Sequence, residues 1–284
     1  MSISNNPTPP SQAQIRKLIR GLVFGSKMHC PECGSRKIKS QGQRYYCRDC
    51  LCRFSLTSHT YLKGTKLNLV TIWTLAWFYI NKAAIGLTVR YTGLSYKAVS
   101  FWYDVFRENL PFGLDDDKLL SGHVQVDEAY FGKYQHKRCL LMAKQLPIKK
   151  RRLGQLRFQV LPPGHNPTRK DVIAFIRKHL IEDSVTLETD KSSFYTNINR
   201  DFRVKKHYRD NHNTFSFKHT SQIEGTFGNF RPFVKRIYGF IPSDKLNALA
   251  NEFCLRYNHP EIFSSVDKFL FYTLHLLKSD SSND

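Results

Sequence analysis

The sequence has little of what a membrane or secreted protein needs. Its longest apolar stretch, Leu69 to Ile80, spans twelve residues and is interrupted by threonines, whereas a membrane-spanning helix needs about 20 apolar residues. The first residues, MSISNNPTPPSQAQ, contain no apolar segment of the kind found in secretory signals. We therefore expect no membrane association. The expected location is the cytoplasm or nucleoid in a bacterium, or the nucleus in a eukaryote.

Acidic residues are also scarce, because 23 Asp and Glu stand against 44 Lys and Arg, a formal net charge of +21. Such a surplus suits a polyanionic partner, most simply nucleic acid, although a basic protein without one would have the same composition. The surplus is uneven: residues 1–60 carry net +8 and residues 121–240 net +13, whereas residues 61–120 carry +2 and residues 241–284 carry −2. With 41% apolar residues the chain can build cores, so we expect several folded modules.

Two Cys-x-x-Cys pairs mark the first module. Cys30 and Cys33 form one pair and Cys47 and Cys50 the other, with thirteen residues and a predicted turn at Gln41-Gly42 between them. Four thiolates brought together by a hairpin give the closed tetrahedral geometry of structural zinc. A redox pair or an iron–sulfur site fits this spacing less well. We expect one zinc ion in this module.

The other three cysteines give weaker evidence of metal binding than the two pairs do. Cys52 is too close to Cys50 to be an independent ligand, although it could substitute for one. Cys139 and Cys254 are isolated and are expected to be small buried apolar residues. Seven cysteines in a chain without a visible secretory signal therefore favour metal or free thiols over a disulfide framework.

The nearly neutral second block is predicted to be helical. Helices are expected over residues 66–81, 83–91 and 96–109, with a Gly-containing turn before the last and Ser95 as its N-cap. This pattern is typical of a helix-turn-helix, although a trihelical connector without DNA-binding function has the same pattern. In the first interpretation the third helix reads a major groove through its early exposed residues. These residues are Ser95, Tyr96, Lys97 and Ser100.

The third block carries three acids at informative positions. Alternation and propensity predict strands near residues 123–131, 138–144, 155–161, 185–190 and 203–209, with a helix over 168–180 and a later one from 219 towards 239. Asp127 lies on the first of these strands, Asp190 ends the fourth, and Glu224 begins the later helix. Carboxylates from two strands and a helix can hold two divalent ions that activate a phosphodiester.

Each acid also has a purely structural interpretation. Asp127 could cap a turn. Glu188 shares a strand face with Asp190, so either could be the useful acid, or both could be solvated. Ser221-x-x-Glu224 matches a capping box, in which Glu224 only satisfies a helix terminus. Basic side chains follow Glu224 along the predicted helix and could clamp a DNA backbone or simply face solvent. They are Arg231, Lys235 and Arg236.

The stretches VQVDEAYFG, LETDKSSFY, KHTSQIEGTF and NEFCLRYNHP, in this order, resemble DDE-type insertion-sequence transposases with an N-terminal zinc ribbon, a superfamily that includes the Merlin-like transposases. The resemblance implies an RNase H-like catalytic domain with Asp127, Asp190 and Glu224 as its triad. It implies two catalytic Mg²⁺ ions, with Mn²⁺ as an alternative, held by these three acids. It also implies that the N-terminal modules recognise inverted repeats and that the protein works as a homo-oligomer on double-stranded DNA.

The sequence departs from that family at the later helix. Phe227 stands where the family usually has Trp, Gly225 and Gly228 weaken the helix, and Pro232 should kink or end it. His219 and Asn258 fall in matching motifs, but no role is assigned to them.

We therefore expect a multidomain α+β protein. Its parts are a tail with a short helix (1–25), a zinc ribbon (26–60), a helix-turn-helix domain (61–112), a linker (113–122), an RNase H-like α/β catalytic domain (123–260), and a C-terminal helix and tail (261–284). The expected function is that of a mobile-element transposase that cuts transposon ends and joins them to target DNA. The alternatives are a catalytically silent DNA-binding regulator and an RNase H-like nuclease without strand transfer.

Overall fold

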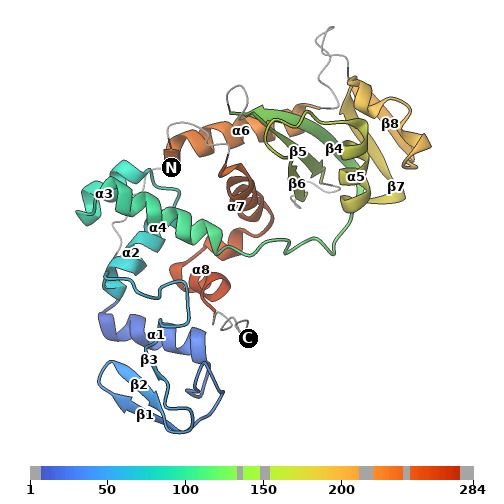
Figure 1. Cartoon of the computed structure of the whole chain (residues 1–284). Coiled ribbons are helices and arrows are strands. Elements are labelled where there is room, and N and C mark those ends of the chain that lie inside the picture. The colour runs from blue at the N-terminus through green and yellow to red at the C-terminus, as the bar shows by residue number, and fades with distance from the viewer. Residues whose placement is uncertain (1–7, 133–136, 148–153, 211–219, 239–243, 276–284) are drawn as a thin grey trace. The chain divides into compact units, whose positions relative to one another are not determined.

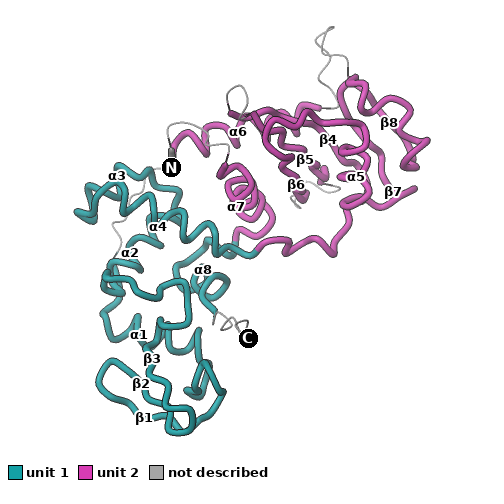
Figure 2. Tube along the Cα trace, viewed as in Figure 1, with its two compact units in different colours: residues 1–111, 261–284 teal, residues 112–260 magenta. Residues whose placement is uncertain are grey.

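The computed structural model (Figure 1) describes residues 8–132, 137–147, 154–210, 220–238 and 244–275, so His219 lies outside the described residues. The chain forms two compact units. Unit 1 combines residues 1–111 with 261–284, and unit 2 comprises residues 112–260 (Figure 2). None of the helices in the described ranges has the length and apolarity that a membrane crossing requires.

Unit 1 begins with a helix and a small sheet. Helix α1 (Gln12–Phe24) starts at a capping box, in which Ser11 and Gln14 bond each other's backbone amides. The sheet is antiparallel with the order β1-β2-β3 and comprises β1 (Ile38–Gln41), β2 (Arg44–Cys47) and β3 (Arg53–Phe54). The β1–β2 turn contains Gly42 at a φ of 63°, the left-handed conformation that glycine adopts at little cost. The turn predicted at Gln41-Gly42 is therefore confirmed.

The rest of unit 1 is helical. It comprises α2 (Leu69–Ile80), α3 (Ile85–Thr92), α4 (Tyr96–Glu108) and α8 (Val266–Thr273). Helices α2, α3 and α4 contact one another, and α8 packs against α2 and α1. The aromatic rings of Tyr79, Phe106 and Phe269, which come from α2, α4 and α8, lie within 5.6 Å of one another, centroid to centroid. The C-terminal helix therefore completes the core of the N-terminal helices.

Unit 2 is built on a five-stranded mixed sheet with the order β6-β5-β4-β7-β8. The strands are β4 (Leu120–Phe131), β5 (Arg138–Gln145), β6 (Leu156–Val160), β7 (Leu180–Asp190) and β8 (Lys206–Asp210). Strands β4, β5 and β6 are antiparallel neighbours, whereas β7 and β8 run parallel to β4. Counted along the chain, β4 is the first strand of this sheet, yet it lies in the middle. Across the sheet the order is third, second, first, fourth and fifth strand. This order agrees with the RNase H-like sheet that the resemblance implies.

Each face of this sheet is covered by helices. One core contains Val124 and Val126 of β4 together with the buried face of α5 (Arg169–His179). The other contains Ala129 and Phe131 with residues of α6 (Ser221–Tyr238) and α7 (Leu246–Asn258). Because side chains alternate along a strand, Gln125 and Asp127 point to the α6 side with Ala129.

The sequence predicted that Pro232 would kink or end the later helix, and helix α6 does not end there but continues to Tyr238. Pro232 is exposed, while Phe230 and Val234 on either side of it are buried in the core beneath α6. Burial of these side chains holds the helix on both sides of the missing backbone donor.

Candidate active site

The sheet register places Asp127 and Asp190 at the same level. In the parallel pairing of β4 with β7, Val124 is opposite Leu187 and Gln125 is opposite Glu188. Continuing this register by two residues puts Asp127 beside Asp190, and both side chains point to the α6 face. The backbone amide of Ser192 donates to Asp190 Oδ1 at 2.9 Å, which orients this carboxylate where β7 ends.

Glu224 comes to the same face because two polar side chains of the sheet hold the start of α6. The backbone amide of Ile223 donates to Gln125 Oε1 at 2.8 Å. Lys144 Nζ on β5 donates to Thr226 Oγ1 at 3.0 Å and to the Gln222 carbonyl oxygen at 3.1 Å. Both anchors lie within two residues of Glu224. The first turn of α6 is therefore fixed against β4 and β5.

A fourth acid adjoins the three predicted ones. Asp210 is opposite Asp190 in the parallel pairing of β7 with β8 and is only 2% exposed. Thr220 Oγ1 lies 3.0 Å from Glu224 Oε1 and 3.3 Å from Asp210 Oδ2, so this hydroxyl links the two acids. Acids from three adjacent strands and one helix thus surround one end of the sheet.

Negative charge accumulates at this point. Burial, together with the charges of Glu128, Asp190 and Glu224, raises the pKa of Asp127 to about 8. Glu128 points to the opposite face, where the buried Tyr195 hydroxyl donates to it at 3.0 Å. In the described residues, the three predicted carboxylates do not form a group whose oxygens all lie within 4.8 Å of one another. A divalent cation bound between them would offset the repulsion.

The structure distinguishes Asp190 from Glu188, which the sequence could not. Glu188 is 5% exposed. It accepts a hydrogen bond from Gln125 Nε2 at 3.0 Å and lies 3.0 Å from His123 Nδ1. Its carboxylate is therefore occupied by neighbouring side chains, whereas Asp190 lies level with Asp127. The capping-box interpretation changes too, because Ser221 is the first residue of α6 and the hydroxyl that bonds the Glu224 carboxylate is that of Thr220.

Two of the three predicted basic residues share a stripe of α6 with Glu224. Arg231 and Lys235 follow Glu224 by seven and eleven residues, about two and three helical turns, so they lie above it on the same face. Arg236 is rotated by about 120° from this stripe. All three side chains are exposed. Phe227, where the family usually has Trp, is 3% exposed and packs in the core beneath α6.

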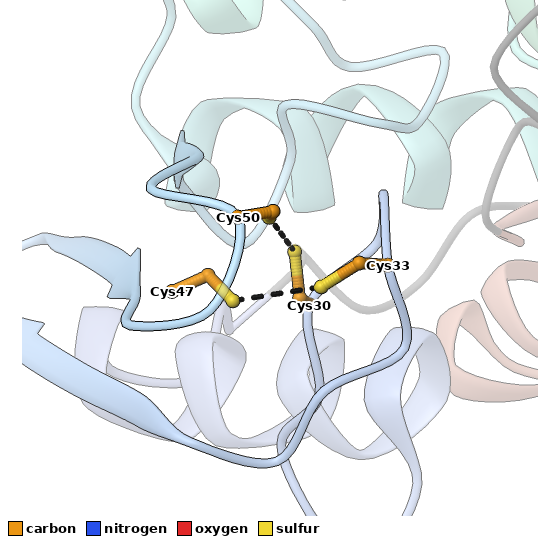
Figure 3. A group of neighbouring side chains, drawn as sticks. All are labelled: Cys30, Cys33, Cys47 and Cys50. Atoms are coloured by element: carbon orange, nitrogen blue, oxygen red, sulfur yellow. Dashed lines mark hydrogen bonds between the residues drawn. The ribbon is translucent and has the colours of Figure 1, made fainter.

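The four predicted zinc ligands converge (Figure 3). The Sγ atoms of Cys30 and Cys50 are 3.5 Å apart, and those of Cys33 and Cys47 are 3.6 Å apart. Four thiolates around one zinc ion with bonds of about 2.3 Å would have sulfur–sulfur separations of about 3.8 Å. All four ligand atoms lie within 4.8 Å of one another. The cluster can therefore hold one structural zinc ion.

The two knuckles have matching backbones. The residue after each second cysteine, Gly34 or Leu51, has a left-handed φ of 74° or 63°. The backbone amide of Cys50 lowers the pKa of the Cys47 thiol to about 6, whereas burial raises that of Cys30. Zinc binding would favour the thiolate form of both.

The candidate groove-reading residues lie at the start of α4. Ser95 is the N-cap, and its hydroxyl oxygen accepts from the Ala98 amide at 3.2 Å. Tyr96 is 55% exposed, Lys97 is exposed and Ser100 is half-buried. The opposite face of α4, with Val99, Trp102, Tyr103 and Phe106, is buried. The trihelical arrangement is therefore present, with its early polar residues accessible.

Sequence reasoning missed several residues that build the site. Gln125 and Asp210 had no local signal, because their partners lie elsewhere in the chain. Asn258, to which no role was assigned, pairs its side-chain amide with both backbone groups of Leu156 (2.8 and 3.0 Å). It thereby closes the edge of β6 as a neighbouring strand would.

A cavity of about 150 Å³ lies elsewhere in unit 2. Its lining includes Phe112, Arg157, His179 and Asn251, and none of the acids described above. It therefore does not belong to the acidic site.

A mixed sheet with carboxylates gathered on one face, beside a helix with an exposed basic stripe, defines a site suited to cations and phosphate esters. Residues 119–258 match the model of the ISXO2-like transposase domain. This match covers just under half of the chain and confirms the resemblance to DDE-type transposases. The family is one of DNA-cutting and DNA-joining enzymes. No curated protein matches the sequence.

Two viral structures show weak similarity. A chain of the simian T-cell lymphotropic virus intasome, solved by cryo-electron microscopy with the PP2A regulatory subunit B56 gamma, is 12% identical with a TM-score of 0.36. The match covers 74% of this chain and 76% of the viral one. The HTLV-2 integrase catalytic core domain in complex with magnesium is 12% identical with a TM-score of 0.32, over 55% of this chain and 98% of the viral one. TM-scores this low do not define a fold.

Proposed function

We propose that the protein is a DNA transposase that binds the terminal inverted repeats of its element, cleaves the ends and joins the resulting 3′-OH to target DNA. The observation that carries the proposal is the sheet register that brings Asp127 level with Asp190 while Gln125 and Lys144 hold Glu224 on the same face. Carboxylates brought together from two strands and one helix can hold two divalent cations at a phosphodiester.

The residues fit Mg²⁺, with Mn²⁺ as an alternative. Hard carboxylate oxygens are the ligands that Mg²⁺ prefers, and Asp127, Asp190 and Glu224 would hold two ions. When bound, these ions supply neutralisation of phosphate charge and a water that is easier to deprotonate. The chain itself positions the acids, and Arg231, Lys235 and Arg236 bind the DNA backbone beyond them.

The N-terminal modules would recognise the DNA ends. The four-cysteine ribbon belongs to the same unit as helices α2 to α4. The start of α4 carries the reading residues Ser95, Tyr96, Lys97 and Ser100, with Tyr96 and Lys97 exposed. Holding two ends at once requires at least two copies of the chain, so we propose a homo-oligomer on double-stranded DNA. A silent regulator is less well supported, because α6 continues through Pro232 and all three acids are present.

The test uses purified full-length protein, Mg²⁺ and a labelled DNA fragment that carries the sequence flanking the gene in its source genome. Nicking at the ends and joining to a plasmid are scored separately. We expect both with the wild type and neither with Glu224→Gln. Glu182→Gln, the same change at an exposed acid of β7 in unit 2, is the matched control and should retain activity.

Three other outcomes are informative. Nicking without joining would indicate that the protein is a nuclease without strand transfer. Tight DNA binding without nicking by the wild type would leave a regulator. If Glu224→Gln retained activity, Glu224 would not be one of the residues that the reaction requires.

A further inference from the structure

Three potential ligand side chains meet beside the four-cysteine cluster without belonging to it. Glu32, Cys52 and His59 each present one ligand atom, and these atoms all lie within 4.8 Å of one another. His59 Nδ1 is 3.5 Å from Glu32 Oε1. Nitrogen and oxygen ligands at about 2.1 Å in a tetrahedron would be separated by about 3.4 Å. The spacing is therefore that of two ligands on one ion.

The backbone around the three residues is already ordered. Glu32 lies inside the first knuckle, which is closed by the Gly34 amide donating to the Cys30 carbonyl at 2.9 Å. The Cys52 carbonyl accepts from the Cys47 amide at 2.9 Å, and the left-handed Leu51 turns the chain just before it. The three donors thus come from segments that the hairpin holds together.

The segment that carries His59 is also closed by hydrogen bonds. The Ser55 amide donates to Ser58 Oγ at 2.7 Å, and the Thr60 amide donates to the Thr57 carbonyl at 3.1 Å. The side chain of His59 is 20% exposed and that of Glu32 is 39% exposed. An ion could therefore reach the group from solvent without the fold opening.

We propose that Glu32, Cys52 and His59 form a second zinc site in unit 1. A thiolate, an imidazole and a carboxylate are a mixed set that suits zinc rather than Mg²⁺ or Ca²⁺. Three protein ligands leave the fourth tetrahedral position to water. The ion fastens the turn at residues 55–60 to both knuckles, so the ribbon and the chain leading to α2 are linked by metal. This site does not depend on the proposed transposase function.

The experiment measures bound metal in full-length protein, purified with zinc and dialysed against metal-free buffer, by inductively coupled plasma mass spectrometry. We expect two zinc ions per chain in the wild type and one in His59→Gln and in Cys52→Ser. Two matched variants should keep both ions. They are His29→Gln, at a half-buried histidine of the same unit, and Cys139→Ser, at a buried cysteine of unit 2.

Cobalt substitution provides a second measurement. Sulfur-to-cobalt charge-transfer absorption should fall by about one thiolate in five both in Cys52→Ser, which lacks the fifth thiolate, and in His59→Gln, which loses the ion that this thiolate binds. The contribution of the four-cysteine cluster should remain in both variants. Glu32→Gln, the mildest change, should weaken the second ion without altering the first. Circular dichroism checks folding, and Glu32→Gln decides the matter if either other variant unfolds.

Two results would overturn the proposal. One zinc ion in the wild type, unchanged in His59→Gln, would leave Glu32 and His59 as an ion pair beside a neutral thiol. One ion in both the wild type and Cys50→Ser, lost only when Cys52 is also replaced, would make Cys52 a substitute ligand of the first ion.

Discussion

At the scale of single residues, the acidic site depends on charges that repel one another. Asp127 is half-buried and flanked by Glu128, Asp190 and Glu224. The same crowding that raises its pKa prepares the site for cations. A side chain that serves binding in this way should reduce stability when no cation is present.

Asp127→Asn should therefore separate activity from stability. We expect strand joining to fall by at least about 10³-fold, because a neutral amide would hold a divalent cation far less well than a carboxylate does. In EDTA at pH 8 the variant should be more stable by at least about 1 kcal/mol, because each unit by which folding raises the pKa of an ionised carboxyl costs about 1.4 kcal/mol. Thermal unfolding measures this change. The control is Asp183→Asn, at an exposed acid, which should change the stability little. A less stable variant would contradict the charge argument.

His179 makes the acid sensitivity of unit 2 testable. It is 3% exposed, and burial lowers its pKa to about 4. The unfolded chain takes up this proton near pH 6.5, so the folded state binds fewer protons between about pH 6.5 and pH 4. The free energy of unfolding should therefore fall as the pH drops through this window.

In His179→Asn, the free energy of unfolding should depend less on pH, by a slope that corresponds to at most about one bound proton. Urea unfolding at several pH values measures this slope. His207→Asn repeats the test, because burial also lowers the pKa of His207 to about 4. Equal pH slopes in the wild type and both variants would contradict the burial argument.

At the scale of elements, α6 carries both the acid and the basic stripe, and it is weakened by glycine. Among the described residues, a Cβ added at Gly228 would meet no atom within 4 Å outside the adjoining backbone of its own helix. Gly228 lies between Glu224 and Arg231 along the helix. In the proposed function the DNA backbone lies along the stripe on either side of Gly228, so a side chain added there would meet it.

Gly228→Ala should raise stability by up to about 1 kcal/mol through helix propensity while lowering strand joining several-fold. Gly21→Ala in α1 is the matched control, since its Cβ also meets nothing within 4 Å. The control should gain stability and keep its activity. If both variants keep full activity, DNA does not approach Gly228 closely.

At the scale of the whole molecule, the two units have different sources of stability. Unit 2 has two apolar cores on either side of a sheet, whereas the ribbon of unit 1 has strands of only two to four residues. Strands this short around four cysteines would be stabilised mainly by a zinc ion bound in the cluster.

Chelation should therefore act on one unit. After treatment with a strong zinc chelator, hydrogen exchange should lose protection over residues 26–60 while residues 120–145 keep theirs. Peptide-resolved mass spectrometry measures both in one sample, and added zinc should restore protection. Equal loss in both regions would show that the units do not unfold separately.

Local patterns predicted much of this protein. The cysteine spacing, the turn at Gly42, the N-cap at Ser95 and the alternation in VTLETD all involve neighbours in the chain, and the structure confirms each. The contact between Gln125 and Ile223 could not be predicted in this way, because 98 residues separate them. Local reasoning could not decide whether the helix ends at Pro232, since helix propensity takes no account of the buried residues on either side.

By itself, the sequence determined the modules, the thiolate cluster and the identity of three candidate acids, because spacing and periodicity act over a few residues. Only the tertiary structure decided that Asp190 rather than Glu188 lies level with Asp127, that Asp210 joins them, and that α8 returns to the N-terminal helices. Sheet register and helix packing minimise the free energy of the whole chain, so no single segment specifies them.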